Sequence, residues 1–524
     1  MAYLAVPIAA KDFEQASGQI DSAISAGAEM LELRTDYLQR LNVDLVKKIA
    51  AHAKNSGGGA LPLIVTCRDI RQGGARDYPV ELRIDVLVTA LKAGVEFVDF
   101  EYENFLVPTN QGRIKVALSE SLKGRLILSA HNFKGKFENI SRLHRHIQTL
   151  YSAAIPKLVY TANHINDCFE AFDLLHSTGP DRIILCMGKA GLISRIIAGK
   201  LDNFLTFASV EEKKATAPGQ LTIEMLKGQF RYDTIDADTE LYGVIASPVA
   251  HSMSPAVHNA CFEQIGANKL YLPLLVEGGK DEFDEFMNSV LSRPWLGFKG
   301  FSVTLPHKHN ALDYAKAKGY DVEFLAERIG AVNTLLISDK PGVYAGNTDF
   351  AGALDSITDA MEIADDALSG MSVAVVGAGG VSRAVVAGLS GAGAKVKIYN
   401  RTVEKAAMLA EEFDCEFAGS DQILEIDAEL LINCTSIGMY PDIQTSPVPS
   451  SCLKGGMTVF DTVYNPVKTL LLSKAKQAGA KTIDGLTMFV NQACAQFSLF
   501  TGQQADPALM RNIVLEKLSF RGAK

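Results

Sequence analysis

Eight short apolar runs recur between Tyr3 and Ala208, and stretches with helical periodicity separate most of them. Two of these stretches, residues 13–27 and 80–94, end in glycine, as a helix C-terminus often does. Strands that alternate with helices form a parallel sheet, and eight of them in about 230 residues predict a (β/α)8 TIM barrel. An open doubly wound sheet would show the same pattern. The runs are YLAVPI (3–8), EMLELR (29–34), PLIVTC (62–67), VEFVDFEY (95–102), RLILSA (125–130), IPKLVY (155–160), RIILCM (182–187) and NFLTFA (203–208).

Charged and hydrogen-bonding residues interrupt these runs or follow them. In a barrel of this kind the C-terminal strand ends form the active-site face. Any one of these residues is most simply a surface salt bridge, but together they predict one site with cations for an anionic substrate and a histidine that moves protons. The residues are Glu32, Arg34, Arg68, Asp99, Glu101, His131, Lys157, Arg195 and the loop Thr216–Gln220.

Lys157 lies in the middle of an apolar run and has two interpretations. Its stem can pack while its ammonium reaches water at the strand end. Alternatively, a desolvated lysine has a lowered pKa and can attack a carbonyl carbon.

The second half contains a glycine-rich turn between a strand and a helix, within Met371–Thr402. Its glycines at 377, 379 and 380 would let the backbone approach a pyrophosphate at a helix N-terminus. The following strand ends in Asn400 and Arg401 without the acidic residue that binds an NAD ribose. Arg401, helped by Lys405, would meet a 2′-phosphate, which favours NADP(H) over NAD(H), unless Arg401 is only a solvated strand-end residue.

Composition excludes several classes of protein. The formal net charge is −9 with no basic run, which argues against a nucleic-acid surface. No window approaches the roughly 18 apolar residues of a membrane span. The eight cysteines are scattered without a Cys-x-x-Cys pair, so we expect no disulfide framework, no metal site and a reducing compartment. The N-terminus resembles neither a signal nor a transit peptide.

The first half resembles type I 3-dehydroquinate dehydratase through ELR, VTCR, SAHN, IPKLV, ISR and APGQ, in this order. The resemblance implies that Lys157 forms a Schiff base with the C3 ketone of 3-dehydroquinate, without a metal, and that His131 is the general acid/base. Glu32 would orient the histidine and contact substrate. The substrate carboxylate and hydroxyls would be bound by Arg34, Arg68, Arg195, Thr216 and Gln220. The chain departs from the family at Gln72, where glutamate is common, and at Thr216, where serine is common.

From Leu241 onward the chain resembles shikimate dehydrogenase, through SPVAHSMSPAVHN, GFSVTLPHK, GAVNTL, GNTDF, DTVYNP and DGLTMFVNQACAQF. Separately these motifs are weak, since Lys308 could be a surface lysine and Asp349 a helix N-cap. The resemblance makes Lys308 and Asp349 the catalytic pair. Ser252 and Ser254 would hold the shikimate carboxylate, and their presence favours shikimate over quinate. The other implied substrate residues are Thr304, Asn333, Tyr464 and Gln492, and the implied NADP residues are Gly377, Ala378, Gly379, Gly380, Val381, Asn400, Arg401, Thr402, Lys405 and Gly485.

The two reactions are consecutive, so the whole chain resembles the plant-type bifunctional dehydroquinate dehydratase–shikimate dehydrogenase family. Its expected substrates are 3-dehydroquinate, 3-dehydroshikimate and shikimate, and the polar stretch 233–239 marks the expected boundary between the halves. We expect a barrel (1–234), a substrate-binding domain (235–350), a Rossmann domain (351–487) and C-terminal helices (488–524).

Two alternatives remain: a quinate/shikimate dehydrogenase with a weak or inactive barrel, and a ligand-sensing protein with a degenerate one. We expect a monomer that contacts neither nucleic acid nor membrane. Its compartment would be the plastid if a transit peptide has been removed, and otherwise the cytoplasm.

Overall fold

The structure is a computed structural model that describes residues 2–56, 61–177, 179–211, 217, 219–338 and 342–522. The chain divides into two compact units, which are described separately below. Unit 1 consists of Met1–Glu240, Asn268–Gly278 and Glu285–Gly297, and unit 2 consists of Leu241–Ala267, Gly279–Asp284 and Phe298–Lys524.

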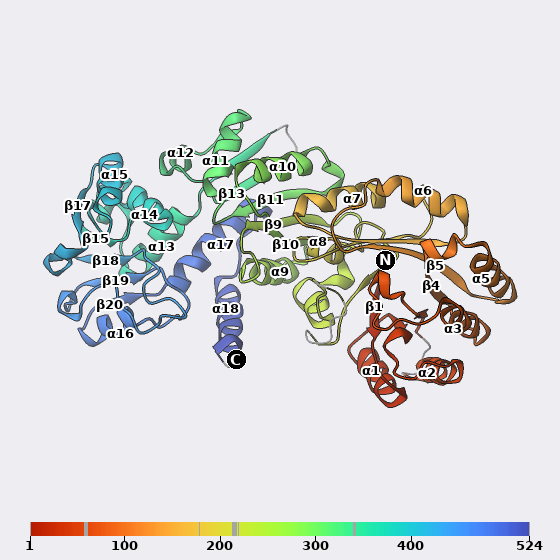
Figure 1. Ribbon diagram of the computed structural model, residues 1–524. Coiled ribbons are helices and arrows are strands. Elements are labelled where there is room, and N and C mark those ends of the chain that lie inside the picture. The colour runs from red at the N-terminus through yellow and green to blue at the C-terminus, as the bar shows by residue number, and fades with distance from the viewer. Residues whose placement is uncertain are drawn as a thin grey trace. The chain divides into compact units, whose positions relative to one another are not determined.

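Unit 1 contains a sheet of eight parallel strands in the order β7-β6-β5-β4-β3-β2-β1-β8. Figure 1 labels β1, β4 and β5 of this sheet. The two end strands of this order, β7 and β8, also contact each other, so the sheet curls into a nearly closed barrel. The predicted barrel is therefore confirmed, and the open doubly wound sheet is wrong. The strands are β1 (Tyr3–Ile8), β2 (Met30–Arg34), β3 (Leu63–Thr66), β4 (Phe97–Glu101), β5 (Arg125–Asn132), β6 (Ile155–Thr161), β7 (Ile183–Met187) and β8 (Leu205–Phe207).

Alternate side chains of each strand point into the barrel, and those at the same height on neighbouring strands form a layer. Ile127 and Ile155 belong to an apolar cluster that also holds Ala5, Met30 and Ile64. Two residues further along the same strands lie Ser129 and Lys157, which are register partners and face the same way as the isoleucines. The polar layer therefore lies nearer the C-terminal strand ends. The connecting helices are α1 (Phe13–Ser25), α2 (Val43–Asn55), α3 (Val80–Lys92), α4 (Tyr102–Phe105), α5 (Pro108–Glu120), α6 (Ile140–Leu150), α7 (Phe169–His176) and α8 (Leu192–Ile196).

In unit 2, the next segment forms a mixed sheet with the strand order β9-β11-β13-β14-β12. Strands β9 and β11 are parallel, and β13 runs antiparallel to β11 and β14. The elements are β9 (Glu240–Ala246), α9 (Ser254–Gln264), β10 (Lys269–Leu275), α10 (Lys280–Leu291), β11 (Phe298–Val303), α11 (Lys308–Ala317), β12 (Asp321–Val322), α12 (Phe324–Ile329), β13 (Thr334–Ile337), β14 (Val343–Gly346) and α13 (Asp349–Met361).

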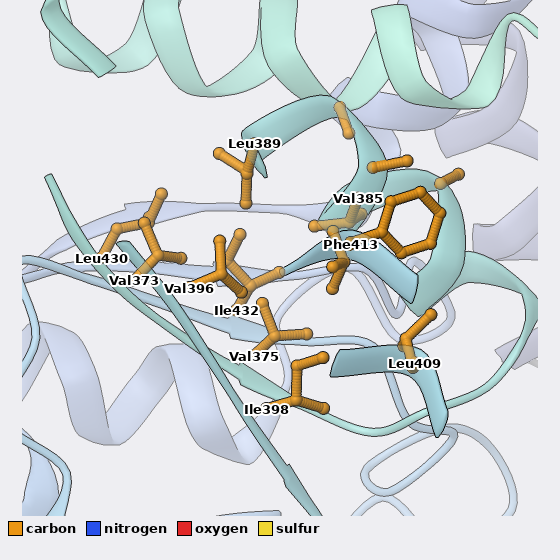
Figure 2. Close-up of a cluster of buried hydrophobic side chains, with 14 of the residues drawn as sticks. Val373, Val375, Val385, Leu389, Val396, Ile398, Leu409, Phe413, Leu430 and Ile432 are labelled. Carbon is orange, nitrogen blue, oxygen red and sulfur yellow. The ribbon is translucent and has the colours of Figure 1, made fainter. Parts of the chain in front are cut away.

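The remainder of unit 2 has the predicted Rossmann architecture, a parallel sheet in the order β17-β16-β15-β18-β19-β20. Figure 2 shows side chains of β15, β16 and β18 packed with those of α14 and α15 in one apolar cluster. Each fully buried aliphatic side chain there contributes about 1.5–3 kcal/mol. The elements are β15 (Ser372–Val376), α14 (Gly380–Gly391), β16 (Lys395–Asn400), α15 (Val403–Phe413), β17 (Glu416–Gly419), β18 (Leu430–Asn433), β19 (Thr458–Asp461), α16 (Leu470–Gln477), β20 (Lys481–Ile483), α17 (Gly485–Thr501) and α18 (Pro507–Gly522).

Helices α13 and α17 pack closely against each other. A Cβ added at Gly352 would lie 2.8 Å from the backbone nitrogen of Gln492, so only glycine allows this approach. The helices begin at Asp349 and Gly485, so this contact connects the two lobes of unit 2. The expected domain bounds at residues 350 and 487 fall inside the first turns of these helices.

Candidate active sites

Lys157 is buried in strand β6, with 4% of its surface exposed. Its Nζ lies 2.8 Å from Asp99 Oδ2 and 3.5 Å from Glu32 Oε1. The ammonium therefore does not reach water at the strand end, and the first interpretation of this residue is wrong. The three groups come from strands β6, β4 and β2 and meet in the polar layer of the barrel.

Asp99 is the centre of this polar layer; the sequence pattern placed it at the predicted site, but the family resemblance gave it no role. Its carboxylate accepts hydrogen bonds from Lys157, from Arg68 Nη2 at 2.7 Å and from Ser129 Oγ at 2.7 Å. Burial alone would raise the pKa of Asp99, but the positive charges of Arg68 and Lys157 outweigh burial and hold that pKa below its ordinary value. Asp99 is therefore a fixed negative charge beside the amine.

His131 lies in β5 and is hydrogen-bonded by Gln72, which ends the short 3-10 turn η2 (Ile70–Gln72). The Gln72 Oε1 accepts the backbone N–H of His131 at 2.8 Å and lies 3.3 Å from its Nδ1. Burial first, and then the positive charges of Arg68 and Lys157, lower the pKa of His131 well below its ordinary value. The imidazole is therefore neutral near pH 7 and can accept a proton.

Glu32 has a different set of partners from the one expected. It accepts a hydrogen bond from Thr66 Oγ1 at 2.8 Å and contacts Lys157. Among the described side chains, Gln72 rather than Glu32 is hydrogen-bonded to His131. This contact depends on how the turn after β3 folds back, which no spacing in the sequence reveals.

The three arginines of the barrel site differ in how far their charges are already neutralised. Arg34 binds Asp36 through two hydrogen bonds of 2.9 and 2.8 Å, and Arg68 pairs with Asp99 and Glu101. Arg195, in α8, is 2% exposed and has no hydrogen-bond or ion-pair partner in the described part of the chain. Burial lowers the pKa of Arg195 to about 10. An unpaired buried guanidinium is costly, so this group is suited to an incoming anion.

The loop that follows β8 is described only in part. Gln220 is buried, but Thr216 lies outside the described residues. Gly219 has φ +77°, and a Cβ there would lie 2.4 Å from the Gly188 carbonyl oxygen, so glycine is required at this turn.

The second site is a cavity of about 380 Å³ in unit 2. It brings together every residue expected to bind or transform the second substrate, from motifs that are far apart in the sequence. Lys308 and Asp349 are the first residues of α11 and α13, and Lys308 Nζ lies 2.5 Å from Asp349 Oδ2. The expected lining residues are Ser252, Ser254, Thr304, Lys308, Asn333, Asp349, Tyr464 and Gln492, with Val381 and Gly485 from the expected nucleotide site.

The chemistry of this cavity suits a small hydroxylated acid. Ser254 begins α9, and its backbone N–H donates to Ser252 Oγ at 3.3 Å. Two hydroxyls at a helix N-terminus form a favourable environment for a carboxylate. Sequence reasoning missed Gln496, which also lines the cavity. The available signal was its position one helical turn after Gln492.

The turn between β15 and α14 fits a dinucleotide. Gly377 has φ +114°, where glycine is favoured, and a Cβ there would lie 3.0 Å from the Thr435 methyl. Gly379 and Gly380 are exposed, and a Cβ on either would meet no protein atom within 4 Å, so their backbone faces open space at the start of α14. This is the concave glycine surface that a pyrophosphate needs.

The end of β16 carries cations and lacks an acid. Asn400 ends the strand, and its side-chain amide donates to the Thr402 carbonyl at 2.8 Å. Arg401 and Lys405 are exposed, and in the described ranges neither is engaged in a salt bridge. Two available cations at this position match the 2′-phosphate of NADP.

Two kinds of feature are absent from the described residues. No group of three or more His, Cys, Asp or Glu side chains is arranged to hold a metal ion. No helix within the described ranges has the length and apolar content needed to cross a bilayer.

Four family models match consecutive parts of the chain. The model of type I 3-dehydroquinase matches residues 4–237. The shikimate dehydrogenase substrate-binding domain matches 244–335, the shikimate/quinate 5-dehydrogenase model matches 359–439, and the shikimate 5′-dehydrogenase C-terminal domain matches 485–515.

Two individual proteins are similar to the second half of the chain. The shikimate dehydrogenase (NADP(+)) of Methanosarcina acetivorans is 38% identical over 53% of this chain and 98% of its own length. A solved structure of shikimate 5-dehydrogenase from Thermus thermophilus, in complex with NADP(H) and shikimate, is 34% identical and covers 53% of this chain and 99% of that chain, with a TM-score of 0.47.

One relative spans both halves. The chloroplastic bifunctional 3-dehydroquinate dehydratase/shikimate dehydrogenase of Arabidopsis thaliana is 34% identical over 98% of this chain and 84% of its own length. Its order of activities is the order in which the barrel and the two-lobed unit occur here. The chain therefore belongs to the family of bifunctional 3-dehydroquinate dehydratase/shikimate dehydrogenases.

Proposed function

We propose that the barrel dehydrates 3-dehydroquinate to 3-dehydroshikimate and that unit 2 reduces 3-dehydroshikimate to shikimate with NADPH. Lys157 is the observation that carries the proposal for the barrel. A buried amine held between two carboxylates, beside a neutral histidine, supports imine chemistry on a small molecule with a ketone.

Lys157 must lose a proton before it can attack. Asp99 is kept charged by Arg68, so we assign this proton to Glu32, whose Oε1 lies 3.5 Å from Nζ. The amine then adds to the C3 ketone, and loss of water gives an iminium. The iminium withdraws electrons from the neighbouring carbon and makes its C–H acidic.

Neutral His131 takes the proton from C2 and delivers it to the C1 hydroxyl, which leaves as water while the C1–C2 double bond forms. One water then hydrolyses the imine and releases Lys157. One water is consumed for each water released at the imine, so the net reaction loses a single water from the substrate. Of the three arginines expected at this site, Arg195 has no ion-pair partner among the described residues, and we assign it to the substrate carboxylate.

Lys308 and Asp349 are the proton-transfer pair of unit 2. NADPH supplies the hydride when bound. Lys308 donates a proton to the carbonyl oxygen as it becomes a hydroxyl, and Asp349 holds the ammonium in position. Ser252 and Ser254 hold the carboxylate, and Thr304, Asn333 and Gln492 contact ring oxygens, with Tyr464 at the wall.

We also propose the four-part division 1–234, 235–350, 351–487 and 488–524, and a monomeric state, because each site is formed by residues of one chain. All eight cysteines are free thiols, which suits a reducing compartment such as the plastid stroma or the cytoplasm.

A coupled assay tests the proposal. With 3-dehydroquinate and NADPH, the wild type should oxidise NADPH, and Lys157→Ala should do so only when supplied with 3-dehydroshikimate. Borohydride with substrate should label Lys157. A wild type that uses only 3-dehydroshikimate would mean that the barrel is inactive, and faster turnover of quinate with NAD+ than of shikimate with NADP+ would identify a quinate dehydrogenase.

A further inference from the structure

Gln496 joins three parts of the reduction site through buried hydrogen bonds. It lies in α17 and is 2% exposed. Its Oε1 accepts from Ser302 Oγ at 2.6 Å, and its Nε2 donates to the Asn333 backbone carbonyl at 3.2 Å and to Thr334 Oγ1 at 3.0 Å. The amide thus connects α17 to β11 and to the start of β13.

The orientation of the Gln496 amide follows from one of these partners. The Asn333 carbonyl can only accept, so the NH2 group of Gln496 must face it. The opposite orientation would place two carbonyl oxygens against each other. The Oε1 therefore faces Ser302, whose hydroxyl must donate.

The same reasoning extends to the side chain of Asn333. Thr334 Oγ1 receives an N–H from Gln496, so its own proton is directed to Asn333 Oδ1, at 2.7 Å. The backbone N–H of Thr348 also donates to Oδ1, at 2.8 Å. Both contacts require an oxygen, so the Asn333 side chain must present its NH2 group on the other side.

Asn333 Nδ2 has two N–H bonds and one partner. One N–H reaches Thr348 Oγ1 at 3.1 Å. The second has no acceptor within the described ranges, and Asn333 lines the cavity. A group that can only donate therefore faces the position of the substrate, and it recognises an oxygen that accepts, such as a ring hydroxyl.

We propose that Gln496 is a positioning residue for this site: it sets the direction of the hydrogen-bond chain from Ser302 to Asn333, so that Asn333 offers an N–H to a ring hydroxyl of the substrate. This inference rests on the function proposed above. Gln496 does not itself donate to the substrate, because both of its N–H bonds are used within the protein.

Replacing Gln496 removes donors at two points. Among the described residues, the Asn333 carbonyl then keeps only the backbone N–H of Val303, at 2.7 Å, and the Thr334 hydroxyl is free to rotate away from Asn333. A hydrogen bond of this kind contributes roughly 1–1.5 kcal/mol, which corresponds to about tenfold in binding. The nucleotide is bound by other elements, so its binding should not change.

Gln496→Leu is the first test, with the full chain assayed for shikimate oxidation by NADP+. The KM for shikimate should rise about tenfold, and the KM for NADP+ should stay within about twofold. Asn491→Ala is the matched control, because Asn491 lies in the same helix and its amide donates to Ser356 at 3.1 Å, outside this network. It should leave both KM values near those of the wild type.

The variants Gln496→Glu and Ser302→Ala distinguish the effect of hydrogen-bond direction from the effect of side-chain packing. Gln496→Glu keeps the size and at pH 8 places one acceptor oxygen where the NH2 group was, so its KM for shikimate should rise at least as much as that of Gln496→Leu. Ser302→Ala keeps both donors and should have the smallest effect. Two shikimate analogues each lack one of the two non-reacting ring hydroxyls. For one of them, the KM values of the wild type and Gln496→Leu should be nearly equal.

Each possible outcome has a definite meaning. A wild type without shikimate oxidation would refute the proposed function itself. An active wild type combined with an unchanged shikimate KM in Gln496→Leu, an equal rise in Asn491→Ala, or a parallel rise in the KM for NADP+ would overturn the role of Gln496. If circular dichroism shows that Gln496→Leu does not fold, the shikimate KM values of Gln496→Glu and Ser302→Ala are compared with that of the wild type instead. An unchanged shikimate KM in Gln496→Glu would then overturn the role of Gln496.

Discussion

Gln72 controls the charge beside His131. Its amide oxygen accepts the backbone N–H of His131, so the imidazole Nδ1 opposite the same oxygen must carry a proton. Nε2 is then the basic nitrogen of the neutral ring. A glutamate here would provide the same acceptor with a negative charge, so Gln72 lowers the basicity of His131 without changing its tautomer.

Gln72→Glu should therefore move the pH dependence of the dehydratase. The added carboxylate stabilises the imidazolium and raises the pKa of His131. The base is active when neutral, so the loss of kcat/KM on acidification should begin at higher pH. The profile is followed by the appearance of 3-dehydroshikimate. The dehydrogenase profile of the same variant is the control, and an unchanged or lowered acid limb in the barrel would contradict the role of Gln72.

The buried charge of Arg195 should lower the stability of unit 1 while it strengthens the binding of 3-dehydroquinate. Arg195→Met removes an unpaired buried charge and should raise the free energy of unfolding of unit 1 by about 1–3 kcal/mol. It should also raise the KM for 3-dehydroquinate at least tenfold. The single tryptophan, Trp295, stacks on His176 within unit 1, with 3.9 Å between the ring centroids. Tryptophan fluorescence therefore reports the unfolding of unit 1.

Arg182→Met is the control for this experiment. Arg182 is also buried in unit 1, but its Nη2 donates to the carbonyls of Leu175 and Ser177 at the end of α7. Its replacement should leave the KM for 3-dehydroquinate unchanged. Destabilisation by Arg195→Met would show that a partner already neutralises that charge.

At the scale of elements, the contact between α13 and α17 holds the proton-transfer pair and the ring-binding residues in register. Gly352→Ala places a methyl group 2.8–2.9 Å from Gln492 atoms, so the helices must separate. We expect a loss of about 1–3 kcal/mol in the stability of unit 2 and a severalfold rise in the KM for shikimate. Thermal melting and steady-state kinetics measure the two effects.

Gly391→Ala is the matched change in α14. A Cβ there meets no atom within 4 Å, so stability should stay equal or rise by about 0.5–1 kcal/mol. Equal behaviour of the two variants would mean that the approach of α13 to α17 is not limited by Gly352.

The elements of the barrel could be predicted well because its strands are buried on both faces and read as apolar runs. The ends were less exact: the run 203–208 contains only the three-residue β8, and β5 extends past the predicted run to Asn132 because it stays paired with β6. Contacts between elements were harder to predict. Lys157 and Asp99 are 58 residues apart, and only the register of the barrel brings them together.

Family motifs supplied the pair Lys308–Asp349, which spacing alone does not indicate. Partners that depend on turns or on helix packing were missed, as Gln72, Asp36 and Gln496 show. Asp36 lies two residues after the end of β2 and binds Arg34, while Gln72 reaches His131 from a turn 59 residues earlier. Local sequence patterns contain no information on either contact.

At the scale of the whole molecule, the two activities should be separable. The barrel site is formed by residues before position 240, and the reduction site by residues after it. A mixture of Lys157→Ala and Lys308→Ala chains should therefore convert 3-dehydroquinate to shikimate after a lag in which 3-dehydroshikimate accumulates in solution. Oxidation of NADPH by the mixture is the measurement, with each variant alone as the control. A mixture as inactive as its components would show that the intermediate made by one chain does not reach another.

The presence of both sites on one chain has a consequence for the supply of shikimate in a cell. Translation delivers the two catalysts in a fixed one-to-one ratio, so gene expression cannot change one without the other. The steady level of 3-dehydroshikimate is then set by the relative turnover of the two sites. A substitution at one site, such as glutamine at position 72, can therefore change the steady level of 3-dehydroshikimate. Two separate genes would change this level through the amounts of the two enzymes.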